Sequence, residues 1–243
     1  MYNIIIICTK HKEIGKCNSD ELCKIIESIS PEVIFEELSN NFFDRFYNTN
    51  LLSDEPLEVK CIKKYLRNHN IKHIPVDIDV SPNLSNDEID YMFNAFKKYD
   101  VYKKLDDELH LLIAQEDFTY LNSKKCSKLF DKMKIIEKNL ITFHPNRNIL
   151  FRIYKLFYEE HDNRENVMLQ NIYNYSKENQ YNQAVFLIGS AHRNSIMQKI
   201  QEYERKEKLK LKWTFLNACI KYKIKSLFLC QVFPKAFRHV LAL

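Results

Sequence analysis

Two histidines stand at matching places in the sequence, where they could take part in metal chemistry. His11 and His192 each stand three residues after a small residue, Cys8 and Gly189, at the end of an apolar run. Imidazole nitrogen together with carboxylate oxygen forms a ligand set that zinc, manganese and cobalt accept in proteins. A single histidine after a strand is usually structural or on the surface, whereas two in matching positions beside carboxylates make a divalent metal site the alternative to that role.

Carboxylates and one arginine could complete such a site. Glu36 and Glu37 are adjacent, so their side chains point to opposite sides of a strand and at most one of them enters a common site. Asp77 stands between two apolar residues, which argues against a purely solvent-exposed role. Arg164 is either an anion clamp, because its guanidinium offers a rigid bidentate fork, or a surface ion pair of little energetic weight.

These side chains can meet only if the strands that precede them lie side by side. Continuous apolar runs rich in β-branched residues predict strands over residues 3–8, 33–35, 71–78, 184–188 and 211–216. Helical spacing of apolar residues predicts helices over residues 18–28, 57–70 and 194–208. The alternation favours an α/β fold with a mostly parallel central sheet flanked by helices, whose ligands bind at the carboxyl ends of the strands.

A large helical insertion is expected between the third and fourth strands. Residues 86–179 contain no strand pattern, and Tyr, Phe and Leu recur there at helical spacing, which predicts three to five helices. One of them is expected over residues 162–177. The insertion leaves the sheet after Asp77 and returns before Gly189, so we expect it to cover the site. Pro75 places the third strand at an edge, or ends it, because proline lacks a backbone donor.

Glycine is scarce in this chain. The sequence has two, Gly15 and Gly189, where average usage of about 7% would give roughly 17. This scarcity excludes the Gly-rich phosphate loops of the Rossmann and Walker types. Gly189 stands between a buried strand and a helix, which predicts either a positive φ or a close approach of its backbone to a ligand or a neighbouring strand.

Charge and cysteine content place the chain among ordinary globular proteins. The 37 basic and 32 acidic residues give a net charge of +5, without the clustering that a nucleic-acid partner requires. Seven cysteines form no CxxC pair, so we expect reduced thiols in a reducing compartment. The first residues have no basic segment and read as a strand instead of a signal peptide, which predicts a cytoplasmic protein.

The end of the sequence differs from the rest. After Glu207 the chain carries only basic charge, interleaved with apolar residues, so residues 217–243 are expected to form a basic amphipathic extension of a domain that covers residues 1–216. The extension either contacts a membrane surface or a partner, or packs on the body as an appended helix. No run approaches the roughly 18 apolar residues that span a bilayer.

Three stretches of the sequence together resemble the TraB/PrgY family, within a group that includes ChaN-like haem-binding lipoproteins, Tiki-type metalloproteases and erythromycin esterases. The opening run that ends in His11 is similar to that family's first strand and Gly-x-x-His motif. Residues 33–38 resemble its second strand, with the family glutamate at Glu37. Arg164 and the residues after it resemble an Arg-acid-x-x-Met helix, and Gly189 to His192 form the second Gly-x-x-His motif.

The resemblance implies a metal-dependent hydrolase that acts on a peptide or ester. His11 and His192 would hold a manganese, cobalt or zinc ion, Glu37 would be a ligand or the base, and Arg164 would stabilise the developing oxyanion. Cys8 departs from the family pattern, which has glycine there, and a Cβ at that turn would shift His11 or demand a strained backbone. The alternative is a catalytically silent binding or regulatory module on the same fold, for haem or a small ligand.

Overall fold

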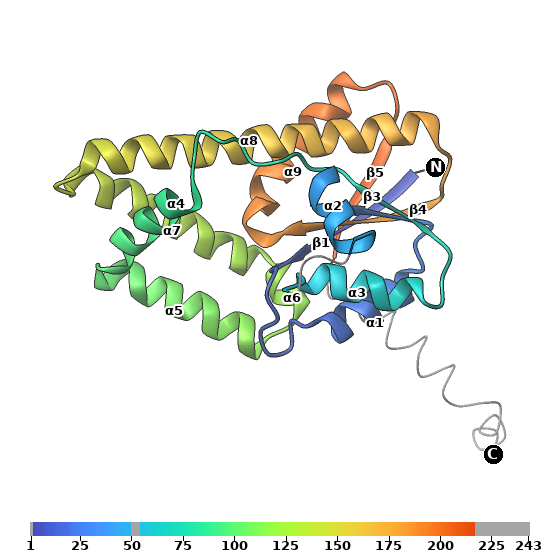
Figure 1. Ribbon diagram of the computed structural model, residues 1–243, viewed down its shortest axis with the longest axis horizontal. Helices are drawn as coiled ribbons and strands as arrows, with labels where there is room; N and C mark the ends of the chain where they lie inside the picture. Colours follow the sequence, from blue (N-terminus) through green and yellow to red (C-terminus); the bar gives the residue numbers. More distant parts are fainter. Residues whose placement is uncertain (1, 50–53, 217–243) are drawn as a thin grey trace, which may run out of the picture.

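A five-stranded parallel sheet forms the centre of the molecule (Figure 1). The computed structural model describes residues 2–49 and 54–216. The strands lie in the order β3-β2-β4-β1-β5, and every pair is parallel. Their bounds are β1 (Tyr2–Thr9), β2 (Val33–Glu36), β3 (Lys72–Pro75), β4 (Gln183–Gly189) and β5 (Leu211–Phe215). The α/β class expected from the apolar runs is therefore confirmed.

Helices cover both faces of the sheet because successive strand residues point to opposite sides. Ile7 and Leu187 pack on the face that carries α1 (Ser19–Ile29) and α3 (Leu57–Leu66). Ile6 and Phe186 pack on the other face, against the second half of α8 (Arg147–Glu178) and α9 (Arg193–Lys206). The strands are buried on both faces, which explains why their sequences are continuous apolar runs instead of alternating ones.

The helical insertion between β3 and β4 is also confirmed. It consists of α4 (Asn86–Lys97), α5 (Asp100–Gln115), α6 (Phe118–Leu121), α7 (Lys124–Phe143) and α8. In Figure 1 the green and yellow helices α4, α5 and α7 extend beyond the carboxyl ends of β1 and β4, and α8 runs back along the sheet. One long helix therefore links the far end of the insertion to the core.

Several boundaries differ from those expected. Residues 162–177 lie inside the single helix α8, which begins at Arg147, so no helix starts at Asp162. The Asp162 carboxylate accepts a hydrogen bond from the Lys199 ammonium at 2.5 Å. The expected helix over residues 57–70 is shorter, and α2 (Asn40–Tyr47) was not expected. Pro75 is the last residue of β3, and β3 is an edge strand, as proline requires.

The part of the chain that the structure describes bears on two further expectations. Its five cysteines, at positions 8, 17, 23, 61 and 126, are buried and form no disulfide with one another. No helix within residues 2–49 and 54–216 combines the length and apolar character needed to cross a membrane. The basic extension over residues 217–243 lies outside the described residues, so its contact with a membrane or partner stays a prediction.

Candidate functional site

The two predicted histidines meet at the carboxyl ends of β1 and β4. Thr9 lies opposite Gly189 in the parallel register, so the residues that follow the two strands are neighbours. A Cβ atom added to Gly189 would lie 3.7 Å from His11 Nε2, 3.6 Å from His192 Cδ2 and 3.4 Å from Glu37 Oε2. Gly189 has a φ of −57°, so the expected close approach is confirmed and the expected positive φ is wrong.

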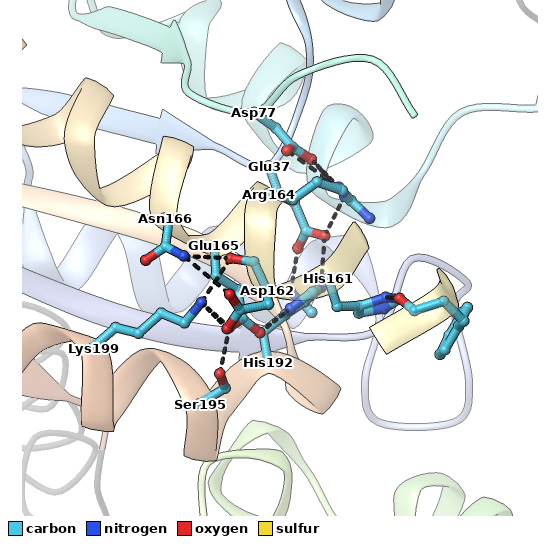
Figure 2. A network of polar contacts seen from close by, with 12 residues as sticks. Glu37, Asp77, His161, Asp162, Arg164, Glu165, Asn166, His192, Ser195 and Lys199 are labelled. Carbon is cyan, nitrogen blue, oxygen red and sulfur yellow. Dashed lines mark hydrogen bonds and ion pairs between the residues drawn. The ribbon is translucent and has the colours of Figure 1, made fainter. Parts of the chain in front are cut away.

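Glu37 is the hub of the site (Figure 2). Its Oε2 accepts a hydrogen bond of 2.5 Å from the Gly189 backbone N–H, and its Oε1 accepts one of 2.9 Å from Arg164 Nη2. His192 Nε2 lies 3.3 Å from the same Oε1. Burial alone would raise the pKa of Glu37, but the charges of His192, His11 and Arg164 hold it well below its usual range.

Asp77 fixes the arginine beside this hub. Arg164 Nη2 lies 2.5 Å from Asp77 Oδ2, and Arg164 Nε donates to the same carboxylate at 3.0 Å. The arginine side chain is 17% exposed, and those of Glu37 and Asp77 are 5% and 3% exposed. Of the two interpretations open for Arg164, the surface ion pair is wrong. Glu36, by contrast, points away from the site and bonds His73 and Tyr47, as the alternation along β2 predicts.

His192 is buried between two carboxylates. Its Nδ1 lies 2.7 Å from Glu165 Oε1 on α8, and its side chain is 5% exposed. Burial alone would lower the pKa of His192, but Glu37 and Glu165 raise it to about 9. Glu165 Oε2 accepts a hydrogen bond from the Ser195 hydroxyl and lies 3.4 Å from Lys199 Nζ. The ring of His192 is therefore fixed in orientation and favoured in its charged form.

His11 is held more loosely. Its Nδ1 lies 3.4 Å from Glu58 Oε1 on α3, and the imidazole is 58% exposed. The Thr9 hydroxyl donates a hydrogen bond to the same Glu58 oxygen. Glu58 raises the pKa of His11 to about 9, as Glu37 and Glu165 do for His192. His11 is therefore also favoured in its charged form, but its exposed ring is the one of the pair that water and a substrate reach more easily.

Cys8 does not distort the turn to His11. It lies opposite Ile188, not Gly189, and belongs to the regular strand β1. Among the described residues Ser30 alone combines a side chain with a positive φ, so the expected strain at Cys8 is absent. The thiol packs in the core against α8 and α9, and burial raises its pKa to about 12. Cys8 is therefore a protonated core residue at neutral pH and a poor metal ligand.

The described arrangement does not fit the divalent metal that the resemblance implies. Within residues 2–49 and 54–216, no group of three or more His, Cys, Asp or Glu side chains is arranged to hold a metal ion. Glu37, the expected carboxylate ligand, already contacts Gly189, Arg164 and His192 through its two oxygens. A metal ion at His192 Nε2 would have to displace one of these contacts. The metal stays a prediction that loading experiments can test.

Sequence reasoning missed three residues that shape the site: Glu58, Lys199 and His161. No pattern singles out Glu58, since its helix meets His11 only in the fold. Lys199 is buried on α9. Its position between the apolar residues Ile196 and Ile200 is a signal that a sequence can give. His161 stacks on His192 with ring centroids 4.8 Å apart, and burial together with the charge of His192 lowers its pKa to about 4.

A cavity of about 560 Å³ leads from these residues into the helical insertion. Its lining includes His11, Glu37, Arg164 and His192 at one end and side chains of α4, α5, α7 and α8 elsewhere. The insertion therefore covers the site, as its position between the third strand and Gly189 predicts. A substrate that lies in this cavity contacts the insertion helices.

Comparison with known proteins adds little to this geometry. No family model matches the chain, and no curated protein matches it either. The chain is similar to a solved structure of an erythromycin esterase EreC mutant in its open conformation, with a TM-score of 0.35 and 14% identity over 76% of this chain. It spans 60% of the length of that protein. The resemblance to the TraB/PrgY family therefore rests on the motifs of this sequence.

Proposed function

We propose that the protein hydrolyses an ester or peptide bond by acid–base chemistry between His11 and His192. The observation that carries the proposal is the pairing of each imidazole Nδ1 with its own carboxylate, Glu58 at 3.4 Å and Glu165 at 2.7 Å. Such a pairing fixes ring orientation and leaves Nε2 of His11 for proton transfer. Nε2 of His192 lies 3.3 Å from Glu37 Oε1 and turns from that carboxylate to the substrate when it donates its proton. Both rings lie beside Gly189 at one end of a cavity large enough for a small-molecule substrate or a peptide side chain.

The two histidines suit opposite roles because their environments differ. The exposed ring of His11 contacts one carboxylate, whereas the buried ring of His192 contacts two. In its neutral form, His11 accepts at Nε2 a proton from the water whose oxygen attacks the substrate carbonyl carbon. His192 stays protonated and donates its Nε2 proton to the leaving group as the bond to that group breaks. Two titratable groups held in different environments of one site commonly divide the acid and base roles in this way.

Arg164 provides the remaining positive charge. Its guanidinium lines the cavity beside His192 and stabilises the negative charge that develops on the carbonyl oxygen. Glu37 has a lowered pKa, which makes it a weak base, so we assign it a positioning role instead of the ligand or base role expected from the sequence. It holds Arg164 and the Gly189 backbone in place, and Asp77 holds Arg164 from the other side.

Hydrolysis of p-nitrophenyl esters and of a mixed peptide library tests the proposal. His11→Gln and His192→Gln should each lower kcat/KM by about 100-fold or more, the usual contribution of a general acid or base. His69→Gln is the matched control, because His69 stacks on Tyr65 and does not line the cavity. It should keep the full rate.

Wild-type rates no higher than those of both glutamine variants, across esters and peptides, would refute the hydrolase proposal and favour the silent binding module. A variant must first be shown to fold by its circular dichroism and melting temperature. A loss of rate that accompanies unfolding would say nothing about the role of the histidine, so the comparison is restricted to folded variants.

A further inference from the structure

The cavity above the two histidines has mostly apolar walls. Six large apolar side chains from four helices line it: Phe93, Leu109, Ile113, Phe130, Met133 and Phe157. Aromatic and aliphatic walls favour an apolar ligand body over a strongly hydrated one. The part of the substrate that lies within the insertion is therefore expected to be a ring system or a hydrocarbon chain.

Most charged groups that face this cavity already have partners. Arg164 is bound to Glu37, and Lys97 Nζ lies 3.2 Å from Asp106 Oδ2. Glu137 is buried and accepts hydrogen bonds from the hydroxyls of Tyr102 and Tyr158 at 3.2 and 3.0 Å. These ion pairs and hydrogen bonds leave few unpaired charged side chains for a ligand to contact.

Two cations in the lining are different. Lys10 and Lys134 form no ion pair with any residue of the described parts of the chain. Lys134 Nζ lies 4.7 Å from the ring centroid of Tyr158, which partly satisfies it. Lys10 has no such contact, is half-buried and adjoins His11 in the chain. Burial lowers the pKa of Lys10, and the charge of the Asp106 carboxylate, with which Lys10 forms no ion pair, offsets this effect only in part.

We propose that this cavity binds an amphipathic anion, whose apolar or aromatic body lies among the insertion helices and whose acidic group bonds Lys10. A carboxylate, phosphate or sulfonate shares the required chemistry, since each offers anionic oxygens to an ammonium group. Lys10 adjoins His11 in the chain, so a ligand whose acidic group bonds Lys10 would place a nearby ester or amide bond beside His11. Only this last step rests on the proposed hydrolysis; the binding itself does not.

Two fluorescent dyes of the same shape test the proposal without any turnover. The anion 8-anilinonaphthalene-1-sulfonate carries an acidic group, and N-phenyl-1-naphthylamine is its uncharged counterpart. Their dissociation constants are measured by fluorescence titration of the full chain. In Lys10→Met the anionic dye should bind roughly 10-fold more weakly, the usual size of a lost charge-assisted bond, and the neutral dye should bind as before.

Two further variants locate the dyes. Lys12→Met removes an exposed lysine two residues away and should change neither dissociation constant. Asn94→Trp places a large side chain on an exposed position of the cavity lining and should weaken both dyes. Melting temperatures near that of the wild type show that each variant is folded.

The proposal is overturned if Lys10→Met binds the anionic dye as tightly as the wild type, or if Asn94→Trp changes neither dye. This outcome is separate from that of the hydrolase proposal. Ester hydrolysis that depends on His11, with anion binding that ignores Lys10, refutes this inference alone. Anion binding that depends on Lys10 in a protein without hydrolytic activity supports this inference and refutes the proposed function.

Discussion

The turns after β1 and β4 present the same residue type at the same sheet edge, yet they hold it in opposite ways. His192 is 5% exposed and lies between Glu37 and Glu165. His11 is 58% exposed and contacts Glu58 alone. The β4 turn is thus part of a buried network that continues into α8 and α9, whereas the β1 turn is open to solvent and ligand. Matching sequence motifs can therefore place one rigid, charged histidine and one accessible histidine in a single site.

The largest expected effect comes from breaking the buried network at its centre. Arg164→Met leaves Glu37 and Asp77 buried without their shared cation. Removal of one partner from a buried ion pair costs about 3 to 5 kcal/mol, so the free energy of unfolding measured in urea should fall by that amount. Arg152→Met, which breaks an exposed pair with Glu88, is the control and should cost less than about 1 kcal/mol.

The second effect is a difference in stability between the variants of the two histidines. His192→Gln should lower the free energy of unfolding at pH 7 clearly more than His11→Gln does, because only His192 is buried between carboxylates. The pKa of His192 is raised to about 9 in the folded protein. Its stabilisation is therefore complete below the ordinary histidine pKa and is lost as the pH rises through about 9.

Urea unfolding at pH 6.5 and at pH 9.5 measures this comparison. The stability gap between the wild type and His192→Gln should shrink at the higher pH. Equal costs for the two histidine variants at both pH values would contradict the asymmetry between the turns.

A third, smaller effect concerns Glu58. Since Glu58 raises the pKa of His11, Glu58→Gln should move that pKa down toward its ordinary value. If neutral His11 is the base, kcat/KM rises with pH through the pKa of His11, so the rising limb of the profile should shift to lower pH in Glu58→Gln. Lys60→Met, on the same helix, removes only a partly exposed ion pair with Glu13 and should leave the limb in place. If the rising limb of the kcat/KM profile does not shift in Glu58→Gln, the group that acts as the base is not a histidine whose pKa Glu58 controls.

Metal removal is expected to have the smallest effect on activity and stability. The contacts of Glu37 leave the arrangement without a three-donor set, so dialysis against a chelator should change neither the hydrolytic rate nor the melting temperature. Elemental analysis after manganese, cobalt and zinc loading checks the same point. One metal ion per chain, lost in His192→Gln, would restore the metal-dependent mechanism that the sequence suggested.

The sequence predicted the sheet and the members of the site better than it predicted their roles. Apolar runs such as residues 3–8 identify strands, because burial on both faces leaves no position for polar residues. Parallel topology then brings His11, Glu37 and His192 to one edge. Glu58 could not be assigned, since it reaches His11 from a helix whose packing no local pattern encodes. The strain expected at Cys8 was wrong because register places it opposite Ile188, within the strand.

Titration of the histidine side chains by ¹⁵N–¹H NMR tests the central claim most directly, because it needs neither substrate nor metal. Assignment uses His11→Gln and His192→Gln. We expect His192 and His11 both to titrate far above the ordinary histidine range, near pH 9, and His161 to stay neutral down to about pH 4. Ordinary titration of His11 and His192 near 6.5 would contradict the pairing of each imidazole with its own carboxylate, on which the acid and base roles rest.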